Sequence, residues 1–147
     1  MSEPLSAPYL LQFTYNRTTG PVIGRFLTGL RDGRIEGVRT KSGKVLVPPV
    51  EYDPETSEAT TDFVEVGQAG VVTTWTWVPA PRELHVLKTP FAFALIKLDG
   101  ADTAMVHVVD APSESAMRTG MRVKVRWAQE RVGYITDIVC FEPEASS

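Results

Sequence analysis

The chain has 147 residues, of which 43% are hydrophobic and 22% are charged, and its formal net charge at pH 7 is −3. This is the profile of one domain that buries about 70% of its unfolded surface without needing a disulfide or a metal. Its one cysteine, Cys140, excludes an intramolecular disulfide and a multi-cysteine zinc site, and it fits a reducing cytoplasm. The longest apolar run, residues 91–96, is far too short to span a membrane.

One helix is expected early in the chain. Pro21 suits a first helical turn and Gly33 suits a helix stop, so the pattern predicts a helix over residues 21–32. With the preceding tail it makes a first region, residues 1–34. The apolar side chains of the helix form one stripe, which is either core or, if the domain is too small to cover it, a docking surface. The candidate partner-binding residues are Val22, Phe26, Leu27, Leu30, Pro48 and Pro49.

A small hairpin follows, in a second region over residues 35–61. Two short apolar segments, 35–38 and 45–47, flank a turn-forming stretch and lead into Pro48 and Pro49. This arrangement predicts a hairpin with a stiff extended exit. The acidic, polar stretch 51–61 is expected to be a linker or a surface loop.

The remainder is predicted to be mainly β. Asp99 and Gly100 make a tight-turn signal, and residues 112–120 leave room for one short helix. This layout favours a small closed antiparallel barrel of the OB type over residues 62–141, followed by a tail over 142–147, and a two-sheet sandwich is the competing layout. Five strands are expected, with a shorter lead-in at residues 62–66: 71–78, 91–98, 103–109, 121–127 and 134–141.

In this order the segments resemble the DUF35 family, small proteins in which a helical N-terminus leads to a rubredoxin-like zinc ribbon and then to an OB-fold. The resemblance covers about residues 13–141. The segments that carry it are FLTGL at residues 26–30, GKVLVPP at 43–49, GVVTTWT at 70–76, PFAFALIKLDG at 90–100 and GMRVKV at 120–125.

The ribbon departs from the family pattern, in which two Cys-x-x-Cys pairs around the double proline hold zinc through four thiolates. The four corresponding positions here are Arg39, Ser42, Asp53 and Thr56, and none supplies a thiolate. We therefore expect a degenerate ribbon without metal. Its order would come from hairpin hydrogen bonds and the packing of its valines, or from a partner.

The resemblance also implies a function. Family members are accessory subunits or domains of thiolase-like or lipid-transfer-protein-like enzymes that act on acyl-CoA thioesters. Their complexes make or cleave carbon–carbon bonds, including retro-aldol cleavage in steroid side-chain degradation. The resemblance therefore implies a heteromeric partner and a coenzyme A thioester as the shared substrate, with no cofactor bound by this chain.

The residues themselves provide no catalytic constellation, because a nucleophile needs a base within hydrogen-bond reach. Cys140 lies between apolar neighbours and is expected in the core. His85 and His107 have no acid or serine at a recognised spacing and are expected to be structural.

Two features could bind a ligand. By strict alternation Thr73, Trp75 and Trp77 share one strand face, so the tryptophans either fill and flank the barrel or form a platform for bases or an apolar ligand. Outward basic side chains on residues 121–127 are either a solvated wall or a strip for an acidic partner or coenzyme A phosphates. The candidate ligand-binding residues are Trp75, Trp77, Phe91, Arg122, Lys124 and Arg126.

Two function hypotheses follow. The first is an accessory subunit of a thiolase-like enzyme, in a complex with no membrane and no nucleic acid. The alternative is a single-stranded nucleic-acid-binding OB protein, which would use Trp75, Trp77 and the basic side chains. The acidity of the whole chain disfavours the alternative.

Overall fold

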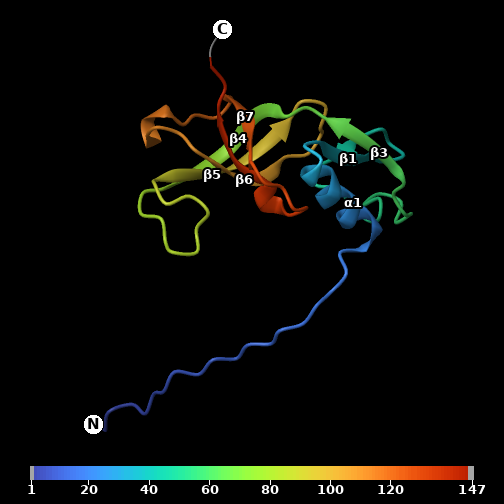
Figure 1. Ribbon diagram of the computed structural model, residues 1–147. Coiled ribbons are helices and arrows are strands. Elements are labelled where there is room, and N and C mark those ends of the chain that lie inside the picture. The colour runs from blue at the N-terminus through green and yellow to red at the C-terminus, as the bar shows by residue number, and fades with distance from the viewer. Residues whose placement is uncertain (1, 146–147) are drawn as a thin grey trace.

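The computed structural model describes residues 2–145, which form one helix, a three-stranded sheet and a closed five-stranded barrel. Figure 1 shows the helix and the small sheet side by side at one end of the molecule and the barrel at the other. Residues 2–18 form an extended arm that runs away from both. No helix within residues 2–145 is long and apolar enough to cross a membrane.

Helix α1 (Gly20–Arg31) lies within one residue of its predicted ends. Pro21 occupies the first turn, where a missing N–H costs nothing. Gly33 ends the helix because it adopts a φ of +76°, which L side chains avoid, and its N–H donates to the Leu30 carbonyl over 3.0 Å.

The small sheet consists of β1 (Ile35–Arg39), β2 (Val45–Leu46) and β3 (Asp62–Val66), in the order β2-β1-β3. Both pairings are antiparallel, which confirms the hairpin predicted after the helix. Strand β3 was expected to lead into the barrel. Instead all five of its residues pair with β1, so the boundary between sheet and barrel lies after Val66.

The barrel contains β4 (Ala69–Val78), β5 (Phe91–Leu98), β6 (Met105–Val109), β7 (Arg122–Trp127) and β8 (Ile138–Pro143). Its closed order is β4-β5-β6-β8-β7, which is the order of an OB-fold. The expected OB barrel is therefore confirmed, but it is mixed rather than antiparallel. Val109 of β6 and Phe141 of β8 pair in parallel, because the chain crosses the barrel end between them.

Two 3-10 turns complete the described chain. η1 (Glu114–Ala116) provides the short helix expected between the third and fourth barrel strands. η2 (Ile135–Asp137) occupies the start of the predicted last strand, so β8 begins later than expected. Strand β8 also runs further than expected, to Pro143, into the segment 142–147 that was predicted to be a tail. Residues 146–147 of that segment lie outside the described residues.

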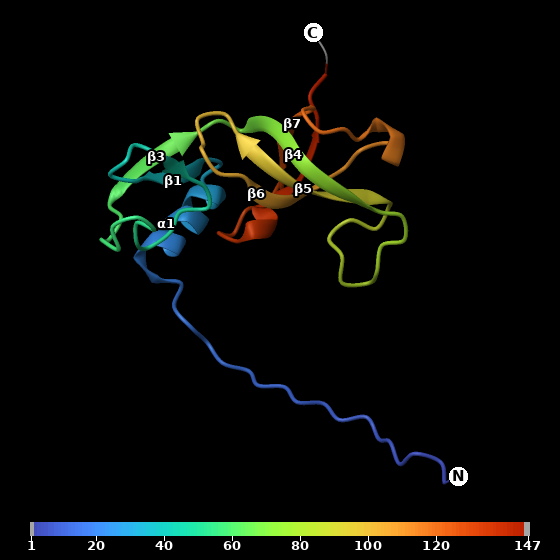
Figure 2. The same ribbon diagram turned by 180° about the vertical axis from the view of Figure 1, so that it is seen from behind.

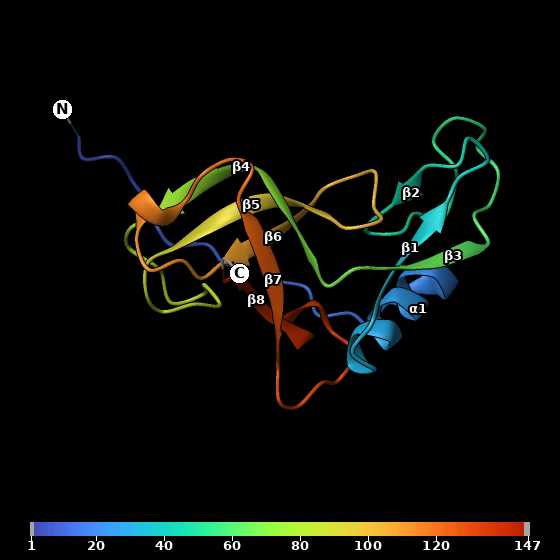
Figure 3. The same cartoon turned by 90° about the horizontal axis from the view of Figure 1, so that it is seen from above.

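The sheet and the barrel share one hydrophobic core, to which Leu30, Ile35, Val45 and Val47 contribute alongside barrel residues such as Val72. The turn after β5 fastens the two parts further. The Asp102 carboxylate accepts a hydrogen bond from the Val45 N–H over 2.8 Å, and its own N–H donates to the Val45 carbonyl over 2.8 Å. Figure 3 shows this turn reaching across to β2.

A bulge in β4 changes which side chains face the barrel interior. The register with β5 slips between Val72 and Thr74, so Thr73 has no partner residue. Val72 is buried in the core before the bulge, and Trp75 and Trp77 pack against the same core after it. Thr73 is exposed, which corrects the prediction that it shares a face with both tryptophans.

Candidate docking surface

The apolar stripe of α1 belongs to the protein's own core. Val22, Phe26 and Leu30 are buried, with exposures of 5% or less, and Leu27 packs against the main core cluster. This corrects the prediction that the stripe is a docking surface. The sheet covers the stripe on one side, since Val22 packs with Val38 and Leu46.

Only one of the two prolines after β2 is accessible to a partner. Pro49 is buried and Pro48 is exposed. A partner could therefore contact Pro48, whereas the predicted docking role of Pro49 is contradicted by its burial.

The three candidate aromatic side chains of the barrel are used wholly or partly in packing. Phe91 is completely buried, so it cannot touch a ligand, and it packs with Val108 and Cys140. Trp75 and Trp77 are partly buried against the core. The aromatic surface that would favour the nucleic-acid alternative is therefore largely used in packing.

The basic side chains of β7 are exposed, but carboxylates pair with them. Arg122 donates to both Asp99 oxygens over 2.7 Å and to Glu144 over 2.9 Å. Arg126 lies 2.9 Å from Asp110 and 3.3 Å from Glu142, and Lys124 lies 3.9 Å from Glu142.

These pairs alter the electrostatics of the strip. The hydrogen bonds from Arg122 lower the pKa of Asp99 and are the main reason that the pKa of Arg122 is raised. A phosphate would have to displace several carboxylates from charge-assisted hydrogen bonds before it could bind here. The ion pairs favour the solvated wall over a strip for coenzyme A phosphates, and the ligand-binding role of Arg122, Lys124 and Arg126 stays a prediction.

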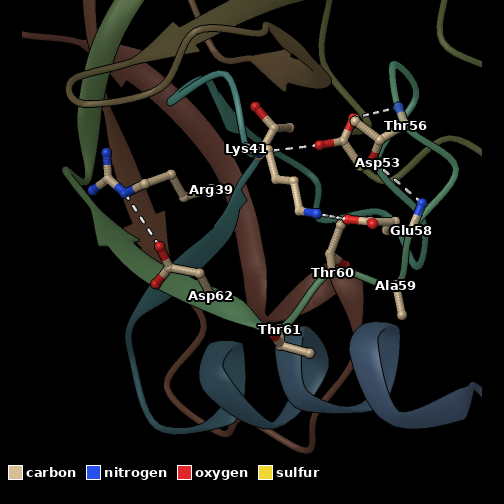
Figure 4. Close-up of a pocket in the computed structure, with 10 residues that line it drawn as sticks. Arg39, Lys41, Asp53, Thr56, Glu58, Ala59, Thr60, Thr61 and Asp62 are labelled. Atoms are coloured by element: carbon tan, nitrogen blue, oxygen red, sulfur yellow. Dashed lines mark hydrogen bonds and ion pairs between the residues drawn. The ribbon is translucent and has the colours of Figure 1, made fainter.

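A polar hollow of about 250 Å³ lies between the β1–β2 turn and the loop before β3. Figure 4 shows Arg39, Asp53 and Thr56 around it, three of the four positions where the family resemblance expects cysteines. The fourth, Ser42, lies 3.0 Å from the hydroxyl of Thr40, another lining residue. The fold thus gathers these four positions into one neighbourhood.

Asp53 links the two loops around the hollow, and the residue is only 4% exposed. Its carboxylate accepts hydrogen bonds from the N–H groups of Lys41 at 3.1 Å, Glu55 at 2.8 Å and Thr56 at 3.3 Å. These bonds, led by that from Glu55, lower the pKa of Asp53. Ion pairs of Lys41 with Glu58 and of Lys44 with Glu55 join the same two loops.

The residues of the hollow do not fit zinc. Thiolate and imidazole, the ligands that structural zinc sites use, are absent from residues 39–62, and the Asp53 oxygens are already occupied by N–H donors. Within residues 2–145, no group of three or more histidine, cysteine, aspartate and glutamate side chains could hold a metal ion.

The isolated cysteine and the strand histidine are structural groups. Cys140 is completely buried, and this burial raises the pKa of its thiol to about 11. Burial lowers the pKa of His107, whose Nδ1 accepts a hydrogen bond from the Val108 N–H over 2.9 Å. Neither group is poised for nucleophilic or acid–base chemistry at neutral pH.

An apolar face on the barrel was missed by the sequence analysis. It is a shallow hollow of about 160 Å³ where the outer sides of β5 and β6 meet η2 and the β4–β5 loop. We call it the barrel face and define it by Val86, Phe93, Val106 and Ile135, which are all exposed. Figure 2 shows the β4–β5 loop projecting from the barrel, with Leu84, which is 95% exposed, within it.

A signal for this face exists in the sequence. Residues 91–96 are a continuous apolar run, whereas a barrel strand with one face in water alternates apolar and polar side chains. Ala92 and Ala94 point into the core and Phe93 points outward, so the run supplies apolar side chains to both faces. The four exposed apolar side chains gathered here make the barrel face a candidate interaction site.

Comparison with known proteins agrees with this fold. Residues 63–128 match the family model described as the C-terminal OB-fold domain of ChsH2. A search of curated proteins finds no match to the chain.

The solved structures that are similar to the chain include the following two. One is a protein of unknown function from the DUF35 family of Sulfolobus solfataricus, with 24% identity over 73% of this chain and 78% of that chain and a TM-score of 0.59. The other is the Ltp2-ChsH2(DUF35) aldolase, with 19% identity over 90% of this chain and 98% of that chain and a TM-score of 0.62. The chain therefore has the fold of these two DUF35 structures, and its residues 63–128 resemble the C-terminal OB-fold domain of ChsH2.

Proposed function

We propose that the chain is a non-catalytic accessory subunit of a thiolase-like or lipid-transfer-protein-like enzyme in the cytoplasm. The observation that carries the proposal is the likeness to a chain of the Ltp2-ChsH2(DUF35) aldolase, which this chain covers almost completely. The barrel face supports it, because an apolar surface of this kind fits a protein partner better than water.

The chemistry that we assign to the complex is cleavage or formation of a carbon–carbon bond in an acyl-CoA thioester, including retro-aldol cleavage in steroid side-chain degradation. The partner would provide the nucleophile and the base. This chain would provide an apolar wall and would help to exclude water from the acyl channel, which strengthens the electrostatic interactions of the partner's catalytic groups.

The test is co-expression with a thiolase-like enzyme of the same organism, followed by light scattering and a retro-aldol assay on acyl-CoA thioesters. We expect a stable heteromeric complex that is active only when both chains are present. Val106→Thr, which keeps the shape of an exposed side chain but adds a hydroxyl, should weaken the complex by about tenfold. Thr76→Ser, on the exposed side of β4, is the matched control and should leave it unchanged. Two chains that purify as separate, non-interacting species would contradict the proposal.

We also infer that the small sheet is a degenerate zinc ribbon in which Asp53 has replaced the metal. Two observations support this inference: where the four cysteine positions of the family lie, and which loops Asp53 joins. Three of the four positions of the family's cysteines line the polar hollow and the fourth, Ser42, lies beside it, and the Asp53 carboxylate joins the two loops that the thiolates would join. A carboxylate that accepts three backbone N–H groups is a strong, charge-assisted link.

A further inference from the structure

The N-terminal arm presents apolar side chains that the protein itself leaves in water. Six large apolar residues of the arm are each between 66% and 106% exposed. Within residues 2–145, no hydrogen bond or ion pair joins residues 2–18 to the helix, the sheet or the barrel. Figures 1 and 2 both show the arm leaving α1 and running away from the body. The six residues are Leu5, Tyr9, Leu10, Leu11, Phe13 and Tyr15.

The composition of the arm differs from that of a flexible linker. Residues 4–16 carry no charge, whereas linkers and disordered segments are rich in charged and small polar residues. Aromatic and leucine side chains are instead typical of the buried centre of a protein interface.

The arm also has the pattern of a β-strand. Leu11, Phe13 and Tyr15 alternate with Gln12, Thr14 and Asn16, so an extended backbone places the three apolar side chains on one face. The arm is drawn out in Figure 1, and no backbone–backbone hydrogen bond involves its residues 2–18. Such a segment binds by adding a strand to an open sheet edge while its apolar face fills a groove.

The length of the arm decides what kind of surface it fits. Eleven extended residues, 5–15, span about 36 Å. The apolar hollow at the root of the arm, about 430 Å³ between Val22, Tyr52 and Phe63, is a local depression and not a groove of that length.

Charge also argues against a second copy of this chain as the receptor. The nearest free sheet edge, β3, carries Asp62 and Glu65, and Glu51 lines the hollow at the root. Asp62 is paired with Arg39 at 3.4 Å, but an uncharged arm would have to desolvate Glu51 and Glu65 without giving them a partner, which is costly. The arm therefore fits a larger protein with an uncharged apolar groove.

We propose that residues 9–15 of the arm are a docking strand that inserts into an apolar groove of the thiolase-like partner enzyme. The inference rests on the proposed function and deepens it. The arm and the barrel face then contact the same partner at two separate places, so each contact raises the effective concentration of the other.

The test compares three versions of the full chain for binding to the co-expressed thiolase-like enzyme by titration calorimetry. Phe13→Ser with Tyr15→Ser removes two aromatic anchors from one face of the arm. It should weaken binding by about 100-fold or more. Gln12→Ser with Thr14→Ser changes the opposite face and should alter binding less than threefold. Both variants should fold as the wild type does, because the four substituted side chains are exposed and, among the described residues, no hydrogen bond or ion pair joins the arm to the body.

A second readout is chymotrypsin cleavage after Tyr9, Phe13 and Tyr15. The cleavage should be fast in the isolated chain and at least tenfold slower in the complex. Equal affinity of the wild type and the Phe13→Ser, Tyr15→Ser variant would overturn the inference and leave the accessory function standing. Failure of the wild type to bind would overturn both.

Three further outcomes would also overturn the inference. A wild-type homodimer that the arm variant converts to monomers would show that a second copy is the receptor. Protection of the arm from chymotrypsin in the isolated monomer would show that it folds back on its own chain. Equal weakening by both pairs of substitutions would show that no face of a strand is recognised.

Discussion

The Asp53 carboxylate accepts a hydrogen bond from the backbone N–H of Lys41 over 3.1 Å, and this bond joins two loops that are twelve residues apart in the chain. Because Asp53 also accepts from Glu55 and Thr56, one side chain sets the geometry of the whole polar hollow. Its lowered pKa gives a direct way to test that role.

Asp53→Asn should destabilise the fold at pH 7, because the amide is neutral and accepts hydrogen bonds through one oxygen only. The folded pKa is lowered, so the stabilisation by Asp53 is present above the unfolded pKa of about 3.9 and is lost as the pH falls through the folded value. Urea unfolding should therefore show a gap between wild type and variant at pH 7 that shrinks below about pH 4. A difference in unfolding free energy that does not depend on pH would contradict a stabilising role of the Asp53 charge.

If the small sheet is a degenerate zinc ribbon, restoring its cysteines should restore zinc binding. Replacement of Arg39, Ser42, Asp53 and Thr56 by cysteine should create a site that binds one zinc ion, because the fold gathers these positions around one hollow. Elemental analysis and the cobalt–thiolate absorption of the cobalt-loaded variant measure it. A variant with only Arg39→Cys and Ser42→Cys is the control. A folded four-cysteine variant that binds no zinc would argue against a ribbon origin.

Leu30→Ala tests whether the helix stripe is core. Leu30 is completely buried, so the substitution should cost about 2–5 kcal/mol of unfolding free energy. Leu84→Ala, at a side chain that is 95% exposed, should change the unfolding free energy by about 0.5 kcal/mol or less. Urea denaturation of both variants measures the contrast, and similar small effects would mean that the stripe is not part of the core.

Cys140 should be chemically silent in the folded protein. Its pKa of about 11 leaves about 100-fold less thiolate at pH 8 than the ordinary value of 9.0 would leave, and its burial slows access further. Reaction with Ellman's reagent should be at least 100-fold slower in buffer than in urea. Cys140→Ala supplies the blank, and fast native labelling would contradict a core position.

His107 should make stability fall on mild acidification. Its folded pKa is lowered by burial, so below the unfolded value of about 6.5 the unfolded chain binds a proton that the folded chain does not. The unfolding free energy should therefore decrease from pH 7.5 to 5.5, and less so in His107→Gln. Equal slopes in the two proteins would show that His107 is not held neutral.

The sequence was sufficient for the elements whose pattern is local. The helix has Pro21 and Gly33 at its ends, and the strand over residues 91–98 has its turn signal at Gly100, so these boundaries follow from side-chain chemistry. The parallel pairing of Val109 with Phe141 could not be foreseen, because it depends on a crossing of segments that are far apart in the chain.

The sites were harder to predict than the strands. Periodicity shows that Val22, Phe26 and Leu30 share a face but not what covers that face. Thr73 has no partner residue in β5, and this bulge reverses the inward–outward alternation of side chains along β4 that the prediction assumed. The positive charge of Arg122 is visible in the sequence, whereas the approach of Asp99 and Glu144, each more than twenty residues away, is a product of the fold.

The hydrogen bonds of Asp102 and Thr103 to β2 have a mechanical consequence. The Thr103 hydroxyl accepts from the Val47 N–H over 2.8 Å and donates to the Val47 carbonyl over 3.1 Å, so side chains of the β5–β6 turn tie the barrel to the backbone of the small sheet. The root of the arm at Gly20 and the barrel face are therefore held at a fixed separation. A partner that binds both the arm and the barrel face must therefore place its two contact sites within the reach of residues 16–19 from this fixed point.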